Sequence, residues 1–146
     1  MNDPNREAIY CLDVIIWGRA DAWWRTPISL QEWRNYARRI YRESLRRPML
    51  CQTVLSGPVL KVHTYAGQGA AAFQKRFMIA VHEDYRFPWV ALHEVAHILT
   101  PDVEWHGTEF ITVYRELIRR HATADVDVMF DRYFTNWGLT EWTVAA

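Results

Sequence analysis

In the first third of the chain, hydrophobic residues recur every three or four positions, which is the spacing of amphipathic helices. The first helix should begin at Asp3-Pro4, because aspartate can cap a helix and proline suits its first turn. The second should begin at the capping box that Ser29 and Glu32 form and should end near Arg46. Its inner face should comprise Leu30, Trp33, Ala37, Ile40, Tyr41 and Ser44.

The middle of the chain changes to short runs of β-branched and aromatic residues, which favour strands. Three such runs should form strands, at residues 52–55, 59–65 and 77–81. A Ser-Gly-Pro sequence at 56–58 is typical of a turn between the first two runs. Residues 67–72 are mostly glycine and alanine, so we expect a loop there.

Helical spacing returns in the last part of the chain. Pro88 can occupy the first turn of a helix and Pro101 cannot continue one, so residues 89–100 should be helical. Two further helices are expected at residues 107–121 and 125–134. The order of elements therefore predicts an α+β fold with helices at both ends and a small β-sheet between them.

Length and composition fit one soluble domain that covers residues 1–146. Half of the residues are hydrophobic, and neither a repeat nor a linker-like stretch interrupts the chain. Cys11 and Cys51 lie far apart and form no metal-like pair, so we expect reduced thiols. Neither a signal peptide nor an apolar stretch of about 18 residues is present, which predicts a cytoplasmic protein without a membrane partner.

The strongest chemical motif is the sequence His93-Glu94-Val95-Ala96-His97 within the predicted helix 89–100. Histidines four residues apart lie on one face of a helix, so both imidazoles can reach one metal ion. His106 follows nine residues later and could supply a third ligand. Three ligands with one open position are typical of a catalytic Zn²⁺, whereas structural zinc has four protein ligands. The alternative is three unrelated surface histidines.

Glu94 is the candidate catalytic residue of this site. Zn²⁺ lowers the pKa of a coordinated water to about 7, and an adjacent carboxylate can accept the proton as the water attacks a carbonyl. Glu94 could then pass the proton to the leaving amine. This chemistry is that of a zinc metallopeptidase.

The residues around His106 leave alternatives open. Asp102, Glu104 and Glu109 are chemically able to replace it as the third ligand. Glu109 could instead accept a hydrogen bond from the imidazole of His106 and orient it. Tyr114 could place its hydroxyl over a developing oxyanion, or it could be an ordinary core tyrosine.

With these residues in place, the chain resembles the zincins, and within them the gluzincin-like and SprT-like metalloproteases. The likeness covers residues 75–120: a strand, a short connection, the His93–His97 helix and then the segment 106–110. SprT-like proteases have a His-Gly-Pro-Glu-Phe-like sequence in that segment, whereas this chain has Thr108 in place of the proline. In size and in its tryptophan- and arginine-rich N-terminal half, the chain is also similar to small metallohydrolases of actinobacteria and their phages.

The resemblance implies a minimal zincin-like domain, with a three-stranded or larger sheet packed on the HExxH helix. It implies one Zn²⁺ ion and a peptide or protein substrate. Residues 77–82 would then form the edge strand of the sheet, able to hold an extended peptide by backbone pairing.

A different function is suggested by the arginines of the second predicted helix. Arg34, Arg38 and Arg42 follow one another at four-residue intervals and so form a stripe along that helix. The stripe could contact DNA, in which case the protein would be an inactive, metal-stabilised module that binds nucleic acid or protein. The alternative is a helix face exposed to solvent.

Overall fold

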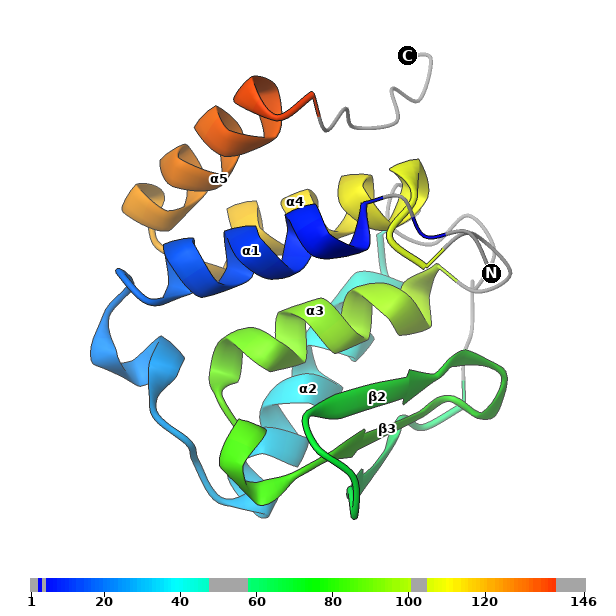
Figure 1. Cartoon of the computed structure of the whole chain (residues 1–146). Helices are drawn as coiled ribbons and strands as arrows, with labels where there is room; N and C mark the ends of the chain where they lie inside the picture. The colour runs from blue at the N-terminus through cyan, green and yellow to red at the C-terminus, as the bar shows by residue number, and fades with distance from the viewer. Residues whose placement is uncertain (1–2, 4, 48–57, 101–104, 139–146) are drawn as a thin grey trace. The chain divides into compact units, whose positions relative to one another are not determined.

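The fold of the protein is α+β, as the order of predicted elements indicated (Figure 1). The computed structural model describes residues 3, 5–47, 58–100 and 105–138. These residues contain five α-helices and one three-stranded mixed sheet. The chain divides into two compact units, one formed by residues 22–101 and the other by residues 1–21 with 102–146.

The unit of residues 22–101 contains two long helices, α2 (Leu30–Leu45) and α3 (Pro88–Leu99), that pack against each other. The N-cap expected at Ser29 is confirmed, because the Ser29 side chain accepts a hydrogen bond from the Glu32 backbone N–H at 3.1 Å. The expected inner face is confirmed except at Leu30, which is half-buried. The buried residues of α2 are Trp33, Tyr36, Ala37, Ile40, Tyr41 and Ser44.

The sheet of this unit has the strand order β1-β3-β2. The strands β1 (Lys61–Thr64) and β3 (Met78–Val81) confirm two of the predicted runs, and they pair in parallel. The strand β2 (Ala70–Phe73) pairs with β3 in the antiparallel direction. The strand predicted at 52–55 lies outside the described residues.

Two predictions about the sheet are wrong. Residues 67–72 were expected to form a loop, but 70–73 form β2, whose alanines have a low strand propensity. Pairing with β3 and packing against α3 stabilise β2 instead, and neither contact can be seen in the local sequence. Residues 77–82 were expected to form an edge strand, but β3 lies at the centre of the sheet because β1 and β2 flank it.

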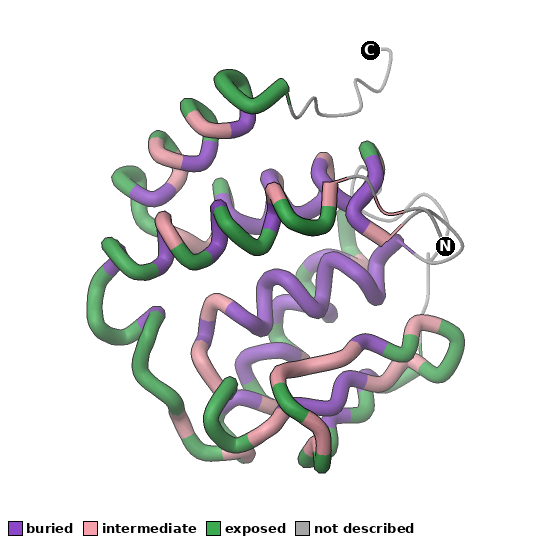
Figure 2. The backbone as a smooth tube through the Cα atoms, in the orientation of Figure 1, coloured by how far each residue is buried: buried purple, intermediate pink, exposed green. Residues whose placement is uncertain are grey.

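The helix α3 is buried along nearly its whole length (Figure 2). It packs against α2, β2, β3 and the 3₁₀ turn η1 (Ala22–Arg25). Both of its ends receive hydrogen bonds from side chains. The Trp33 indole donates to the Phe87 carbonyl at 2.9 Å, and the Gln74 amide donates to the carbonyls of His97 and Thr100 at 3.0 and 3.3 Å. The helix that carries the motif is therefore held in place at both ends.

The other unit contains α1 (Arg6–Trp17), α4 (Thr108–His121) and α5 (Ala124–Asn136). The helix α5 packs against both α1 and α4. The buried guanidinium of Arg115 connects α4 to α5 through an ion pair with Asp127 at 2.9 Å. The predicted helix start at Asp3 is wrong, because α1 begins at Arg6 with Asn5 at its N-cap position.

Within the described residues, none of the helices is long and apolar enough to span a membrane.

Replacing Gln74 with methionine should destabilise the protein. The change keeps the length of the side chain but removes the donor that satisfies two carbonyls at the end of α3, which should cost about 1–3 kcal/mol. Urea denaturation would measure the free energy of unfolding. The matched control is Gln68→Met at an exposed glutamine, which should stay within about 0.5 kcal/mol of the parent. Equal values for the two variants would contradict this account of α3.

Candidate metal centre

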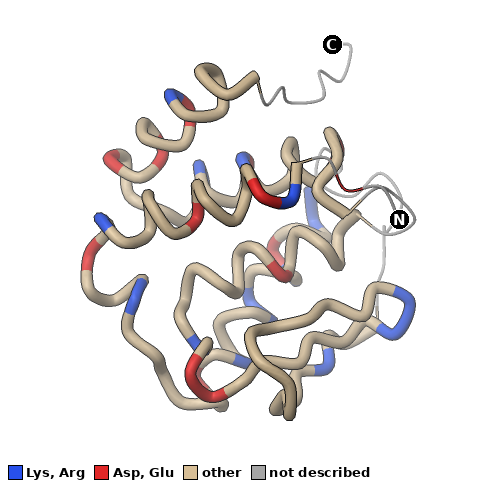
Figure 3. Tube along the Cα trace, in the orientation of Figure 1, with Lys and Arg blue, Asp and Glu red and all other residues tan. Residues whose placement is uncertain are grey.

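The first part of the candidate centre comes from residues 93–97 of α3. His93 and His97 lie one turn apart, and their ring centroids are 5.1 Å from each other. Both are buried, with 3% and 4% of their surface exposed. Glu94 is the only charged residue of this helix, and it too is buried (Figure 3). Three polar side chains thus occupy two turns of a helix whose other residues are apolar.

The second part comes from His106, which precedes the first turn of α4. Its imidazole is 3% exposed, and its Nδ1 atom lies 2.8 Å from Oδ2 of Asp3. The rings of Tyr10 and Phe110 contact the imidazole edge-on, with centroids 5.3 and 4.9 Å away. The Asn5 side-chain amide donates a hydrogen bond to the His106 carbonyl at 2.9 Å.

The contact with Asp3 determines which nitrogen of His106 can bind a metal ion. An ionised carboxylate only accepts hydrogen bonds, so in the neutral form of His106 the proton is on Nδ1, and this N–H donates a hydrogen bond to Asp3. The lone pair is then on Nε2, on the other side of the ring. This pairing of a carboxylate with the second nitrogen is typical of histidines that bind metals.

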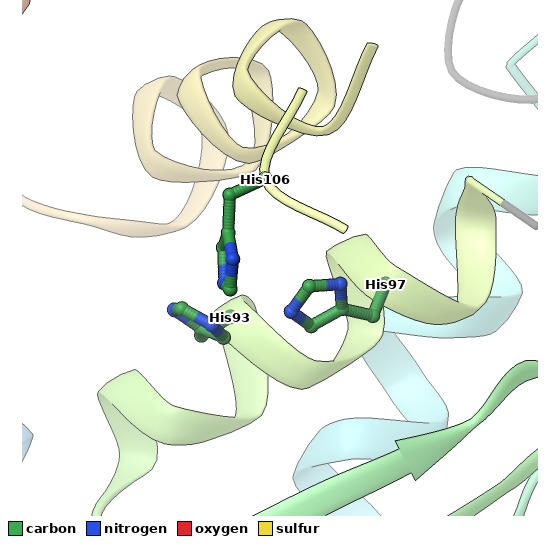
Figure 4. A group of neighbouring side chains, drawn as sticks. All are labelled: His93, His97 and His106. Atoms are coloured by element: carbon green, nitrogen blue, oxygen red, sulfur yellow. The ribbon is translucent and has the colours of Figure 1, made fainter. Parts of the chain in front are cut away.

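The three histidines form one cluster, in which the candidate ligand atoms all lie within 4.8 Å of one another. Figure 4 shows the rings of His93 and His97, from α3, turned toward the ring of His106. Three buried imidazoles could hold a metal ion, and nitrogen ligands of this kind suit Zn²⁺. The structure thus brings together the three residues that the sequence predicted as ligands.

The competing carboxylates have different positions. Glu109 is half-buried in the first turn of α4 and is not part of the histidine cluster. Asp3, rather than Glu109, is the acceptor found on Nδ1 of His106. Asp102 and Glu104 lie outside the described residues.

Asp3 and Asn5 are the site residues that the sequence did not reveal. Asp3 precedes His106 by 103 positions, and its proline neighbour made a helix cap the natural interpretation. No local pattern joins residues so far apart, so only the tertiary structure could identify the contact.

Tyr114 has partners that favour its interpretation as a core residue. Its side chain is fully buried, its hydroxyl donates to Oδ1 of Asp13, and it accepts a hydrogen bond from the Trp17 indole at 3.1 Å. Asp13 is itself buried, so the tyrosine satisfies a carboxylate within the core. A role over an oxyanion stays a prediction.

Two arginines of the predicted stripe are engaged within the protein. Arg34 donates to the Val62 carbonyl at 3.0 and 3.2 Å, and Arg38 donates to the Leu60 carbonyl at 2.8 Å. Arg42 is exposed. These contacts connect α2 to β1 and to the residue before it, and they give Arg34 and Arg38 a structural role, whereas contact with DNA stays a prediction.

Comparisons of the chain with protein-family models, with curated proteins and with solved structures find no match.

We predict that the protein binds one Zn²⁺ ion and that His97→Ala and His106→Ala each abolish stoichiometric binding, because each removes one of three ligands. Zinc analysis after dialysis would measure the stoichiometry. Zinc at 100 times its Kd should also stabilise the parent by about 2.7 kcal/mol. The control is His63→Ala, at an exposed histidine of β1, which should bind zinc as the parent does. Full zinc content in His106→Ala would remove His106 from the ligand set.

The change Tyr114→Phe distinguishes the two interpretations of that residue. We expect a loss of about 1–3 kcal/mol in the free energy of unfolding with unchanged zinc content, since the change leaves the buried Asp13 without this donor. The control Tyr85→Phe removes an exposed hydroxyl and should have little effect. Unchanged stability combined with slower hydrolysis would instead favour the oxyanion role.

Proposed function

We propose that the protein is a zinc-dependent metallohydrolase that cleaves peptide bonds. The observation that supports this most strongly is the buried cluster of His93, His97 and His106 with Glu94 beside the first of them. A cluster of three histidines fits a catalytic site better than a structural one, because structural zinc is closed by four protein ligands. Within the described residues, the cluster contains three candidate ligands, and a site with three protein ligands would keep a fourth position for substrate or water.

The ion would supply the Lewis acidity that polarises a carbonyl and lowers the pKa of water to about 7. The proton transfers would be carried out by a residue of the chain itself. Glu94 accepts the proton of the attacking water and then donates it to the departing nitrogen. Glu94 is buried on an otherwise apolar helix, one residue after His93, and in this role its carboxylate would have to lie within hydrogen-bond reach of the attacking water.

The sheet supports a peptide as the substrate. An extended peptide can add to a sheet by pairing with the free edge of an outer strand. The expected edge, 77–82, is central, but β2 is an outer strand that packs against α3. Among the described strands, only β3 pairs with β2. We therefore assign the substrate to the edge of β2 that faces away from β3.

We also propose that the fold is zincin-like and related to the SprT-like proteases. Support comes from a small sheet that packs on the HExxH helix and from a third histidine that directly precedes the next helix.

The decisive test is Glu94→Gln, which keeps the shape of the side chain and removes its ability to accept the proton. We expect full zinc content and a loss of hydrolysis of about 10²–10⁴-fold. The assay would follow cleavage of an unfolded, fluorescently labelled protein by the zinc-loaded enzyme. The matched control is Glu83→Gln, at an exposed glutamate of the 3₁₀ turn η3 (Glu83–Tyr85), which should keep the parent rate.

Two results would overturn the proposal. One is a parent protein that binds zinc but cleaves no peptide or unfolded protein. The other is a Glu94→Gln variant that cleaves its substrate at the parent rate.

A further inference from the structure

We propose that Asp3, together with Asn5, positions His106 and thereby sets how tightly the site holds its metal ion. This inference rests on the proposed function, because it takes His106 as a ligand. It adds a role for the segment before α1, which contains none of the predicted ligands.

The orientation of the His106 ring depends on its contact with Asp3. Asp3 Oδ2 lies 2.8 Å from Nδ1, and the side chains of Asp3 and His106 are 16% and 3% exposed. In so enclosed a place, a charge-assisted hydrogen bond is short, directional and little screened by water. It fixes the proton on Nδ1 and keeps the lone pair of Nε2 available for a metal ion.

The backbone of His106 is held by a contact with Asn5. His93 and His97 lie within α3, His97 in its last turn, and both belong to the helical main chain. His106 instead lies in a turn before α4, outside any helix. The hydrogen bond from the Asn5 amide to the His106 carbonyl therefore supplies a side-chain anchor for this turn.

The plane of the His106 ring is fixed by two aromatic neighbours. Tyr10 of α1 and Phe110 of α4 both contact the imidazole edge-on, at 70° and 82°. These contacts restrict rotation of the ring. The hydrogen bond with Asp3 holds Nδ1 toward the carboxylate, so Nε2 points away from it. The segment that begins at Asp3 and continues into α1 therefore determines the direction of this ligand.

The experiment compares the zinc affinity of the full-length parent with that of Asp3→Ala, Asp3→Asn and Asn5→Ala, by competition with a chromophoric chelator. We expect Asp3→Ala to weaken zinc binding about 10–100-fold, as the loss of such a carboxylate partner does elsewhere. Asp3→Asn should weaken it less, because the amide oxygen can still accept from Nδ1. The matched control is Glu7→Gln, which removes one negative charge from the exposed first turn of α1 and should keep the parent affinity.

Three further measurements separate positioning from general stability. Thermal unfolding of the metal-free proteins should give similar midpoints for the parent, Asp3→Asn and Glu7→Gln. Long-range ¹H–¹⁵N spectra of the metal-free parent should show the His106 proton on Nδ1, and Asp3→Ala should lose that preference. The visible spectrum of bound Co²⁺ should change in Asp3→Ala and not in Glu7→Gln.

The outcomes distinguish this inference from the proposed function. Tight zinc binding by the parent, with Asp3→Ala and Asp3→Asn within twofold of it, would overturn the positioning role and leave the hydrolase proposal intact. A parent that binds no zinc would overturn both. Weakened binding in the Asp3 variants, in a protein without peptidase activity, would support the positioning role and reject the proposed reaction.

Discussion

The burial of polar side chains in an apolar helix is the constraint on which the rest of the structure depends. His93, Glu94 and His97 lie on α3 with almost no exposure, and burying such groups is unfavourable unless they have partners. The unit around α3 offsets this with extensive apolar packing from α2 and the sheet. Gln74 and Trp33 also satisfy backbone groups at its two ends. A rigid, dry helix is what a metal site with a carboxylate base requires.

Around His106, too, one segment supplies the candidate ligand and another segment holds it in place. The ligand comes from a turn, and its support comes from the segment Asp3–Tyr10, more than 90 residues earlier in the chain. Sequence separation on this scale makes the support invisible to motif analysis, although the support determines which nitrogen the imidazole offers. His93 and His97 differ because their spacing along α3 already places them together.

Local patterns in the sequence predicted the helices well, because helical spacing, caps and prolines act within a few residues. They also predicted the three histidines as candidate ligands, because His93 and His97 are one helical turn apart and His106 follows nine residues later in the sequence. They did not predict β2, because a run of alanines becomes a strand only through its partners. The order of the strands was likewise beyond local patterns. The same limit applies to Arg34 and Arg38, because periodicity marks a helix face without showing that β1 lies against it.

An HExxH sequence alone is weak support for a metal site, because any helix places residues i and i+4 together. The position of His106 is a separate observation, since no rule of helix geometry requires a histidine from beyond the end of α3 to join the pair. Its Nδ1 atom also contacts the half-buried carboxylate of Asp3, which leaves the other nitrogen for a ligand role. A chance group of buried histidines has no reason to combine these two features. Their agreement, more than the motif, favours a metal centre in this protein.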